Sequence, residues 1–186
     1  MKREYLFSYL IALLMFGFLS CSDEDDSTTD EGSDETTTCL EYLNQEAQGE
    51  FQGESFTAQG GTYSEFFGEY RCKIYVNELI GGDCSFPEFG GNEAVIIFSL
   101  EALELQSITF TDTAEIGETV NTLNFNSIVL EDNVSVTVVE LATCGALEIT
   151  DVDLENNTVS GTIVAKGQEG SFINGNFTLD FCEFGF

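Results

Sequence analysis

The side chains of this chain that could take part in chemistry are its carboxylates and its cysteines. The sequence has 34 Asp and Glu residues, six Cys and no His. Without histidine, His-dependent triads, Cys–His pairs and His-ligated zinc are excluded. Glycoside hydrolysis needs only two acids facing one cleft, and Glu101 with Glu104 or Glu115 with Glu118 could be nominated. Among so many acids, close pairs are expected by chance. We therefore predict a protein that is not an enzyme, with a carboxylate-dependent glycoside hydrolase as the alternative.

A short acidic segment is the best candidate for a cation site. Asp151, Asp153 and Glu155 alternate along the chain, and Ca²⁺ takes several carboxylate oxygens from a short loop. The segment lacks the Gly and the distal Glu of an EF-hand loop, and Val152 and Leu154 are typical strand residues. We therefore interpret it as the acidic end of a hairpin. A calcium-binding adhesion module stays an alternative, with Ca²⁺ as the one cofactor considered.

Cys21 stands where an apolar segment gives way to an acidic run. Two basic residues precede an almost unbroken apolar run over residues 6–19, which is too short to span a bilayer core of about 30 Å as a helix. Ser20 then comes directly before Cys21. This arrangement resembles bacterial lipoprotein precursors, in which a peptidase cuts before the cysteine and the cysteine carries diacylglycerol. The resemblance implies a signal peptide over residues 1–20, lipidation at Cys21 and a membrane contact through that lipid.

The residues after Cys21 have the composition of a tether. Residues 22–38 are Asp, Glu, Ser, Thr and one Gly, and such a segment buries too little apolar surface to fold. We predict a disordered acidic tether over residues 21–38. Its start, Ser22-Asp23-Glu24-Asp25-Asp26, resembles the surface-export signal of Bacteroidota lipoproteins. That resemblance implies an outer-membrane lipoprotein that faces the cell exterior, and a periplasm-facing orientation is the alternative.

The chain beyond the tether has the size of a single domain and a strongly negative charge. Residues 39–186 suffice for one hydrophobic core. They contain 25 acids and only three basic residues, Arg71, Lys73 and Lys166, which gives a formal charge near -22. Such a charge repels nucleic acid and anionic lipid. We therefore exclude nucleic acid as a partner.

The five remaining cysteines fit an exported domain. Five is an odd number, so one thiol should stay free in an oxidising compartment. Cys72 shares one face of an alternating segment with Ile74 and Val76, and we predict that it is a buried free thiol. The four disulfide candidates are Cys39, Cys84, Cys144 and Cys182. The first pairing considered is Cys39 with Cys84 and Cys144 with Cys182, but the sequence leaves the connectivity open.

The pattern of the domain is that of strands. Thr38 and Glu41 form a capping box that predicts a short helix over Cys39–Ala47. After it, polar and apolar residues alternate in about nine segments bounded by turn residues: 51–58, 69–79, 93–100, 105–111, 122–130, 134–142, 147–154, 158–166 and 171–181. We predict an all-β domain, an antiparallel β-sandwich of about nine strands with a short N-terminal helix. The long connections 81–91 and 112–118 favour a sandwich, and a closed β-barrel is the alternative.

The densest aromatic cluster is expected to pack in the core or at a sheet edge rather than to form a ligand platform. It consists of Tyr63, Phe66, Phe67 and Tyr70. The chain has no Trp, which weakens the case for a site that stacks on carbohydrate.

The end of the chain carries a second resemblance. Residues 146–162 and the glycine-marked strand after them are similar to uncharacterised Bacteroidota lipoproteins with an all-β domain of unknown function. That family offers no catalytic residues to transfer. We therefore predict a membrane-anchored cell-envelope lipoprotein, exposed at the surface, with a non-catalytic binding or structural β-domain. Its partner would be a glycan or an envelope protein.

Overall fold

The computed structural model of the protein describes residues 39–82, 84, 87–89, 93–113, 121–131 and 134–183. The chain divides into two units, Met1–Thr36 and Thr37–Phe186, and every described residue belongs to the second. The predicted signal peptide, Cys21 and the predicted acidic tether lie outside the described residues.

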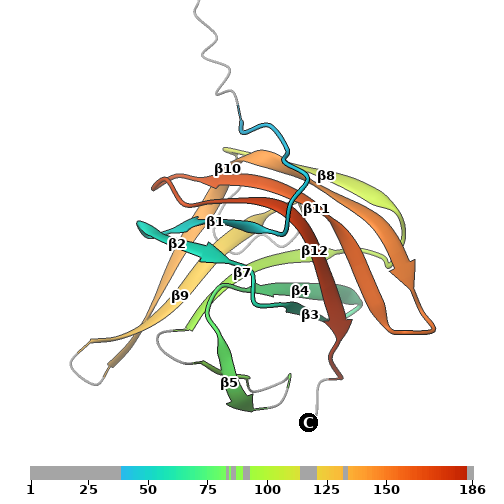
Figure 1. The fold of residues 1–186 in the computed structure, drawn as a ribbon, viewed down its shortest axis with the longest axis horizontal. Coiled ribbons are helices and arrows are strands. Elements are labelled where there is room, and N and C mark those ends of the chain that lie inside the picture. The colour runs from blue at the N-terminus through green and yellow to red at the C-terminus, as the bar shows by residue number, and fades with distance from the viewer. Residues whose placement is uncertain are drawn as a thin grey trace, which may run out of the picture. The chain divides into compact units, whose positions relative to one another are not determined.

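The described chain is all-β, as the sequence predicts. Its strands, shown in Figure 1, are β1 (Gln48–Phe51), β2 (Glu54–Thr57), β3 (Gly61–Phe66), β4 (Glu69–Tyr75), β5 (Leu79–Gly82), β6 (Pro87–Phe89), β7 (Glu93–Leu100), β8 (Gln106–Thr111), β9 (Leu123–Glu131), β10 (Val134–Asp153), β11 (Thr158–Gly167) and β12 (Phe172–Phe181).

Seven of these strands close into a barrel. The pairing runs from β11 through β10, β9, β7, β4, β3 and β12, and β12 pairs again with β11. All of these pairs are antiparallel except β3 with β12, which is parallel and joins only Thr62 with Asp180 and Tyr63 with Phe181. The structure therefore has the closed barrel, the alternative considered from the sequence, and the preference for a sandwich is corrected. Strand lengths do not predict the short β3–β12 contact that closes the sheet.

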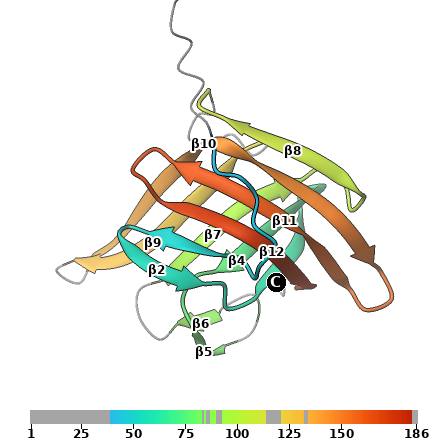
Figure 2. The same cartoon turned by 45° about the horizontal axis from the view of Figure 1, so that its top comes forward.

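The other strands extend or flank this barrel. β1 pairs with the first residues of β12 and β2 pairs with β1, while β8 pairs with the second half of β10. β5 and β6 form a separate two-stranded sheet, which Figure 2 shows together with the barrel.

β10 unites two of the predicted strands. Residues 134–142 and 147–154 belong to one strand of 20 residues. Its first half pairs with β9 and its second half with β8, and its register against β11 shifts between Ala142 and Cys144. A bulge of this kind bends a strand without ending it. The change of partner along one strand explains why the sequence pattern looks interrupted there.

The predicted helix over Cys39–Ala47 is wrong. These residues form an extended segment, here called the strap, along the outward-facing Asn side chains of β12. The Leu43 N–H donates to Asn174 Oδ1 at 2.8 Å, and Asn174 Nδ2 donates to the Glu41 carbonyl at 2.7 Å. The Asn174 amide therefore provides hydrogen-bond partners for the Leu43 N–H and the Glu41 carbonyl. These two backbone groups do not need the hydrogen bonds of a helix.

One hydrophobic core fills the barrel, formed by the inward-facing residues of alternate strand positions. Cys72 is a free thiol with no exposed surface, as predicted, and its burial raises its pKa. The predicted aromatic cluster divides between two environments. Tyr63 is 2% exposed and packs in the core, whereas Phe67 is 95% exposed. The largest side chains with almost no exposed surface are Tyr75, Phe98, Phe125, Ile74, Ile96, Leu100, Leu123, Leu147, Ile149, Ile163, Ile173 and Leu179.

Candidate functional site

The two ends of the barrel differ in what they present. At one end, here called the mouth, lie the β1–β2 turn, the β11–β12 turn and the junction of the end of β4 with the start of β7. The opposite end, here called the far end, carries the β3–β4 and β10–β11 turns. Figures 1 and 2 both show the β1–β2 and β11–β12 turns side by side and away from the β10–β11 turn.

A cleft of about 490 Å³ opens at the mouth, between the β1–β2 hairpin and the barrel rim. A volume of this size is within the range of small-molecule sites, which proteins often place in the mouths of β-barrels. Three buried apolar residues, Phe51, Val76 and Ala94, contribute to its lining. Its polar lining comes from Gln52, Glu54, Ser55, Thr57, Gln59, Asn77, Glu78 and Ser127.

The β1–β2 hairpin is fixed over the rim by one aromatic and two polar contacts. Phe51 is 5% exposed and stacks on Phe125, with ring centroids 6.1 Å apart. Gln52 Nε2 donates to Ser127 Oγ at 3.0 Å, and the Gln52 N–H donates to Ser171 Oγ at 3.3 Å. The hairpin is therefore held to both β9 and the start of β12, so the wall of the cleft that it forms is ordered by the barrel itself.

The turn of this hairpin has an unusual residue for its backbone. Gln52 and Gly53 both have positive φ, 52° and 83°, the pattern of a two-residue type I′ turn. Asn-Gly is the common choice in such turns, because a longer side chain gains less from the left-handed conformation. Gln52 has the length to reach Ser127, which explains its presence here.

The cleft contains a buried acceptor that no described group satisfies. Asn77 Oδ1 is inaccessible to solvent and has no hydrogen-bond partner. Leaving such a group unpaired costs roughly 1–3 kcal/mol. Glu54 and Glu78, both exposed, add two carboxylates to the lining, and no Lys or Arg is among the described lining residues. The described lining therefore gives the cleft a negative charge, whereas the inaccessible Asn77 Oδ1 is not open to a ligand.

Glu140 places a further carboxylate at the same end of the barrel. It is 4% exposed and pairs in register with Phe125. Its Oε1 accepts hydrogen bonds from the Glu169 N–H at 2.6 Å and the Ser171 N–H at 3.2 Å, so it supports the β11–β12 turn. Its Oε2 has no partner. Glu140 is not among the residues that line the cleft, and its role is to hold the β11–β12 turn.

A larger groove of about 590 Å³ runs between the strap and β2. Leu40 and Leu43 of the strap, which are 41% and 53% exposed, line it together with Phe56 and Phe172. The Asn174 amide in this groove is engaged by the strap on both its oxygen and its nitrogen. Because the strap already occupies both groups of the Asn174 amide, this groove is a weaker candidate for a ligand site than the mouth cleft.

The structure does not assemble the predicted calcium candidates into a site. Asp153 Oδ1 accepts from the backbone N–H groups of Glu155 and Asn156, and its Oδ2 accepts from the Asn156 amide. These hydrogen bonds hold the pKa of the Asp153 carboxyl below its usual value. Asp151 is exposed on β10. Within the described ranges, no group of three or more acids or cysteines could hold a metal ion.

The first nominated carboxylate pair, Glu101 with Glu104, does not line the cleft. Glu101 and Glu104 are exposed in the β7–β8 connection and line neither the mouth cleft nor the strap groove. Glu115 and Glu118 lie outside the described residues.

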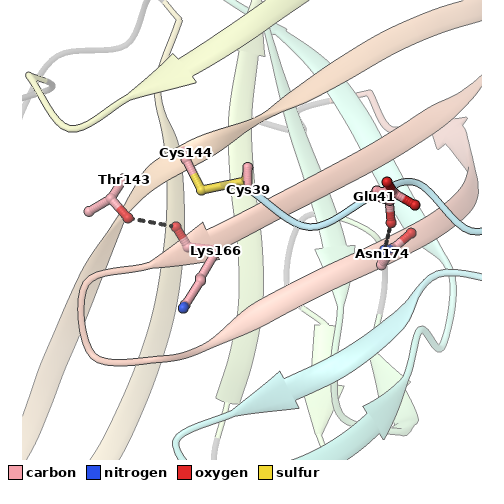
Figure 3. The surroundings of a disulfide bond; sticks show 6 residues. All are labelled: Cys39, Glu41, Thr143, Cys144, Lys166 and Asn174. Atoms are coloured by element: carbon pink, nitrogen blue, oxygen red, sulfur yellow. Dashed lines mark hydrogen bonds between the residues drawn. A yellow bond between two sulfur atoms is a disulfide. The ribbon is translucent and has the colours of Figure 1, made fainter. Parts of the chain in front are cut away.

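The four predicted disulfide cysteines are paired differently from the first pairing considered. The bridges are Cys39–Cys144 and Cys84–Cys182, with Cα–Cα distances of 5.7 and 5.6 Å. Figure 3 shows that the strap begins at β10, where Cys39 meets Cys144. Cys182 directly follows β12, and its N–H donates to the Tyr63 carbonyl. The correct pairing depends on which strands become neighbours, which the spacing of the cysteines does not reveal.

Comparison with known proteins adds no relative: no family model, curated protein or solved structure matches the chain. In the part of the chain that the structure describes, no helix is long and apolar enough to cross a membrane.

Sequence reasoning missed the residues of the mouth cleft. Gln52, Asn77 and Ser127 come from distant segments, and each is a single polar residue in an otherwise ordinary pattern. Two signals were present. Gln52-Gly53 interrupts an alternating segment as a hairpin turn does, and Ser127 replaces an apolar residue on the face that Leu123 and Phe125 share.

Proposed function

We propose that this protein is a membrane-anchored lipoprotein of the cell envelope, exposed at the cell surface, whose barrel is a non-catalytic binding module with its site in the mouth cleft. One observation carries the binding part of the proposal. The cleft combines three buried apolar residues, Phe51, Val76 and Ala94, with a polar lining, which is the usual composition of a small-molecule site. A ligand with an apolar part would bury that part against Phe51 and place its polar groups at the rim.

The anchoring part of the proposal has its support in the sequence. The apolar residues 6–19, the small residue before Cys21 and the acidic residues after it are together typical of a lipoprotein precursor. A diacylated cysteine supplies the two chains that stable anchoring needs. The formal charge near -22 on the domain would keep the barrel from adhering to anionic lipid.

Intact mass tests the anchor. The chain purified from membranes should have a mass that begins at Cys21 and includes acyl groups, and a Cys21→Ser variant should leave the membrane fraction. An unmodified chain that is freely secreted would reject the lipoprotein assignment. It would leave the binding site in the barrel untouched.

Backbone amide shifts in NMR spectra test the cleft. A library of small fragments, added to the mature chain, should produce saturable shifts that centre on the residues lining the mouth. Thr57→Trp adds a large side chain at the exposed rim of the cleft and should abolish these shifts. Thr109→Trp makes the same change at an exposed position of β8 and should leave them intact. Shifts that are scattered over the surface, or equal in the two variants, would reject the site.

A further inference from the structure

We infer that β8 is a docking site for an extended segment of another protein, which pairs with its free edge as an added strand and carries basic residues at both ends. No residue of β8 is among the described lining of the mouth cleft, so the inference does not depend on a ligand there. It depends on the pairing of β8, on its composition and on the charges at its two ends.

The pairing of β8 leaves one of its edges open in the described part of the chain. β8 pairs with β10 from Gln106 to Thr111, and with no other described strand. Figures 1 and 2 both show it at the border of the barrel. In an antiparallel pair, alternate residues direct their N–H and C=O groups away from the partner. The open edge of β8 therefore presents a row of backbone donors and acceptors with which a further strand can pair.

The two faces of β8 show that an added strand would meet an ordered template. Ile108 and Phe110 are 7% and 2% exposed and belong to the core, whereas Ser107, Thr109 and Thr111 are exposed on the opposite face. The inner face therefore fixes β8 to the barrel, while the free edge stays unpaired among the described strands. Because the template is already formed, a partner strand does not have to order it on binding.

β8 lacks the features by which proteins usually protect an edge strand from pairing. Protected edge strands are commonly very short, or they carry charges or proline. β2 has four residues, one of which is Glu54, and β6 has three, among them Pro87 and Glu88. β8 has six residues, none of which is charged or proline. Its edge therefore accepts a partner strand more readily than the edges of β2 and β6 do.

The charges around β8 indicate what the partner strand carries. Glu104 and Asp112 flank the two ends of β8, and both are exposed. Glu148 of β10, also exposed, lies opposite Ser107. No Lys or Arg lies on β8 or on the part of β10 that pairs with it. Since opposite charges at facing positions stabilise a strand pair and like charges destabilise it, a segment with basic residues at both ends fits this edge best.

The same charges argue against a second copy of this chain as the partner. An antiparallel pair of two β8 strands would bring the Glu104 end of one copy to the Asp112 end of the other. This repulsion would occur twice, once at each end of the pair. Each domain also carries a formal charge near -22, which opposes the association of two copies. The partner is therefore a segment of a different protein.

Three matched peptides test this inference on the mature chain. The Lys peptide is the capped segment Lys-Val-Thr-Val-Thr-Val-Thr-Val-Lys, whose two ends are as far apart in sequence as Glu104 and Asp112. The Glu peptide has Glu at both ends instead. The Pro peptide keeps the Lys ends but has Pro at its central position, which removes a backbone donor and interrupts strand pairing.

Shifts of backbone amides in NMR titrations measure binding of the three peptides. We expect the Lys peptide to bind about tenfold more tightly than the Glu peptide, because two facing pairs change from attraction to repulsion. The Pro peptide should not bind measurably. Raising the salt concentration should narrow the difference between the Lys and Glu peptides.

Hydrogen exchange distinguishes strand addition from a contact of side chains alone. Binding of the Lys peptide should slow exchange at alternate amides of β8, those that point away from β10. The amides that already donate to β10 should change little. Charge attraction without strand pairing does not give this alternation.

Variants at exposed positions locate the charge effect without changing the core. Glu104→Gln and Asp112→Asn should each weaken binding of the Lys peptide several-fold. Glu54→Gln removes the same charge from an exposed position of β2, the edge strand at the mouth, and should have no effect.

Several outcomes would each overturn the inference. If the Lys peptide does not bind at millimolar concentration, the edge does not accept a strand. Equal affinity of the Lys and Pro peptides, or binding without protection of β8 amides, would reduce the effect to attraction by an acidic surface. Equal affinity of the Lys and Glu peptides, or equal effects of Asp112→Asn and Glu54→Gln, would remove the role of the flanking acids. A dimer that sediments as such and protects the β8 amides without any peptide would assign the edge to a second copy.

Discussion

A hairpin turn at each end of the barrel has the same backbone conformation. Its first residue is bonded to the barrel at the mouth and projects into solvent at the far end. Gln52-Gly53 at the mouth and Phe67-Gly68 at the far end both have two residues with positive φ, 52° and 83° in the first, 53° and 89° in the second. Neither has the Asn that such a turn favours. Gln52 bonds to Ser127 and closes the wall of a cleft, whereas Phe67 projects from the surface with 95% of its area exposed.

The contacts of the two residues show whether the free-energy cost of the left-handed conformation is offset within the fold. Holding an ordinary residue in the left-handed region costs roughly 1–2 kcal/mol relative to glycine. At Gln52 a hydrogen bond across the mouth offsets that cost, so the residue is explained within the fold. At Phe67 the described contact is an edge-to-face arrangement with Phe66, with ring centroids 4.6 Å apart, and Arg71 lies over the Phe66 ring. Phe67 therefore gives little back to folding stability.

Removing either disulfide should have the largest effect on the free energy of unfolding. The two removals should differ in where amide exchange becomes faster. The bridges join residues 105 and 98 positions apart, and closing loops of this length contributes about 4–5 kcal/mol in the chain-entropy model. Replacing either pair by Ser should therefore lower the free energy of unfolding by about the same amount in denaturant titrations. Only loss of Cys39–Cys144 should speed amide exchange in the strap, for example at Ala47, whose N–H donates to Asn176. Equal exchange in the strap of both variants would contradict this separation.

Phe51→Ala should destabilise the domain by about 3 kcal/mol, within the usual range for a buried phenylalanine. It removes the ring that stacks on Phe125 and leaves a cavity at the mouth. Phe181→Ala, at the far end, removes a ring that is 43% exposed and should cost less than half as much. Urea titration of both variants measures the difference. Similar losses would show that the mouth is no better packed than the far end.

Exchanging the two turn residues for Asn compares the ends directly. Phe67→Asn should raise the free energy of unfolding by roughly 0.5–1 kcal/mol, because Asn tolerates the left-handed conformation. Gln52→Asn should be neutral within about 0.5 kcal/mol, since a shorter side chain improves the turn but loses the bond to Ser127. Thermal unfolding of the pair gives the comparison. A destabilised Phe67→Asn variant would mean that this ring supports the fold after all.

The smallest expected effect is the pH dependence of the β10–β11 turn. Hydrogen bonds from Asn156 and Glu155 lower the pKa of Asp153 in the folded state. A carboxyl group whose folded pKa is depressed stabilises the fold above the unfolded value of 3.8, and this contribution is lost as the pH falls through the lower folded pKa. Asp153→Ala should therefore be less stable than the parent at pH 6, with the difference shrinking toward pH 3. Asp151→Ala serves as the control without these bonds, and a difference that is constant with pH would reject the assignment.

Much of the fold could be predicted from local pattern. The alternation of residues 158–166 and 171–181 specified β11 and β12 almost to the residue, and the face shared by Cys72 and Ile74 placed that thiol in the core. The predictions failed where a segment's state depends on distant partners. The strap has the spacing of a helix but is bonded to the side-chain amides of Asn174 and Asn176. β3 contains too short an alternation to stand out between two glycine-marked turns.

The candidate site was harder to predict for the same physical reason. Barrel closure depends on two residue pairs between β3 and β12, and it is closure that brings Gln52, Asn77 and Ser127 to one rim. Asn77 and Ser127 are ordinary residues for their segments, and Gln52 is unusual only for a turn conformation that the structure reveals. The disulfide pairing also depends on which segments are neighbours in the fold. Cys39, at the start of the strap, lies beside Cys144 of β10.

The position of the Cys39–Cys144 bridge has a mechanical consequence. It joins the first described residue of the chain to the longest strand of the barrel. A pulling force applied to the chain before Cys39 therefore enters β10 through a covalent bond, which is stiffer than the hydrogen bonds of the strap. The bridge therefore places the point where such a force enters the barrel on β10, and not on the β1–β2 hairpin that forms one wall of the cleft.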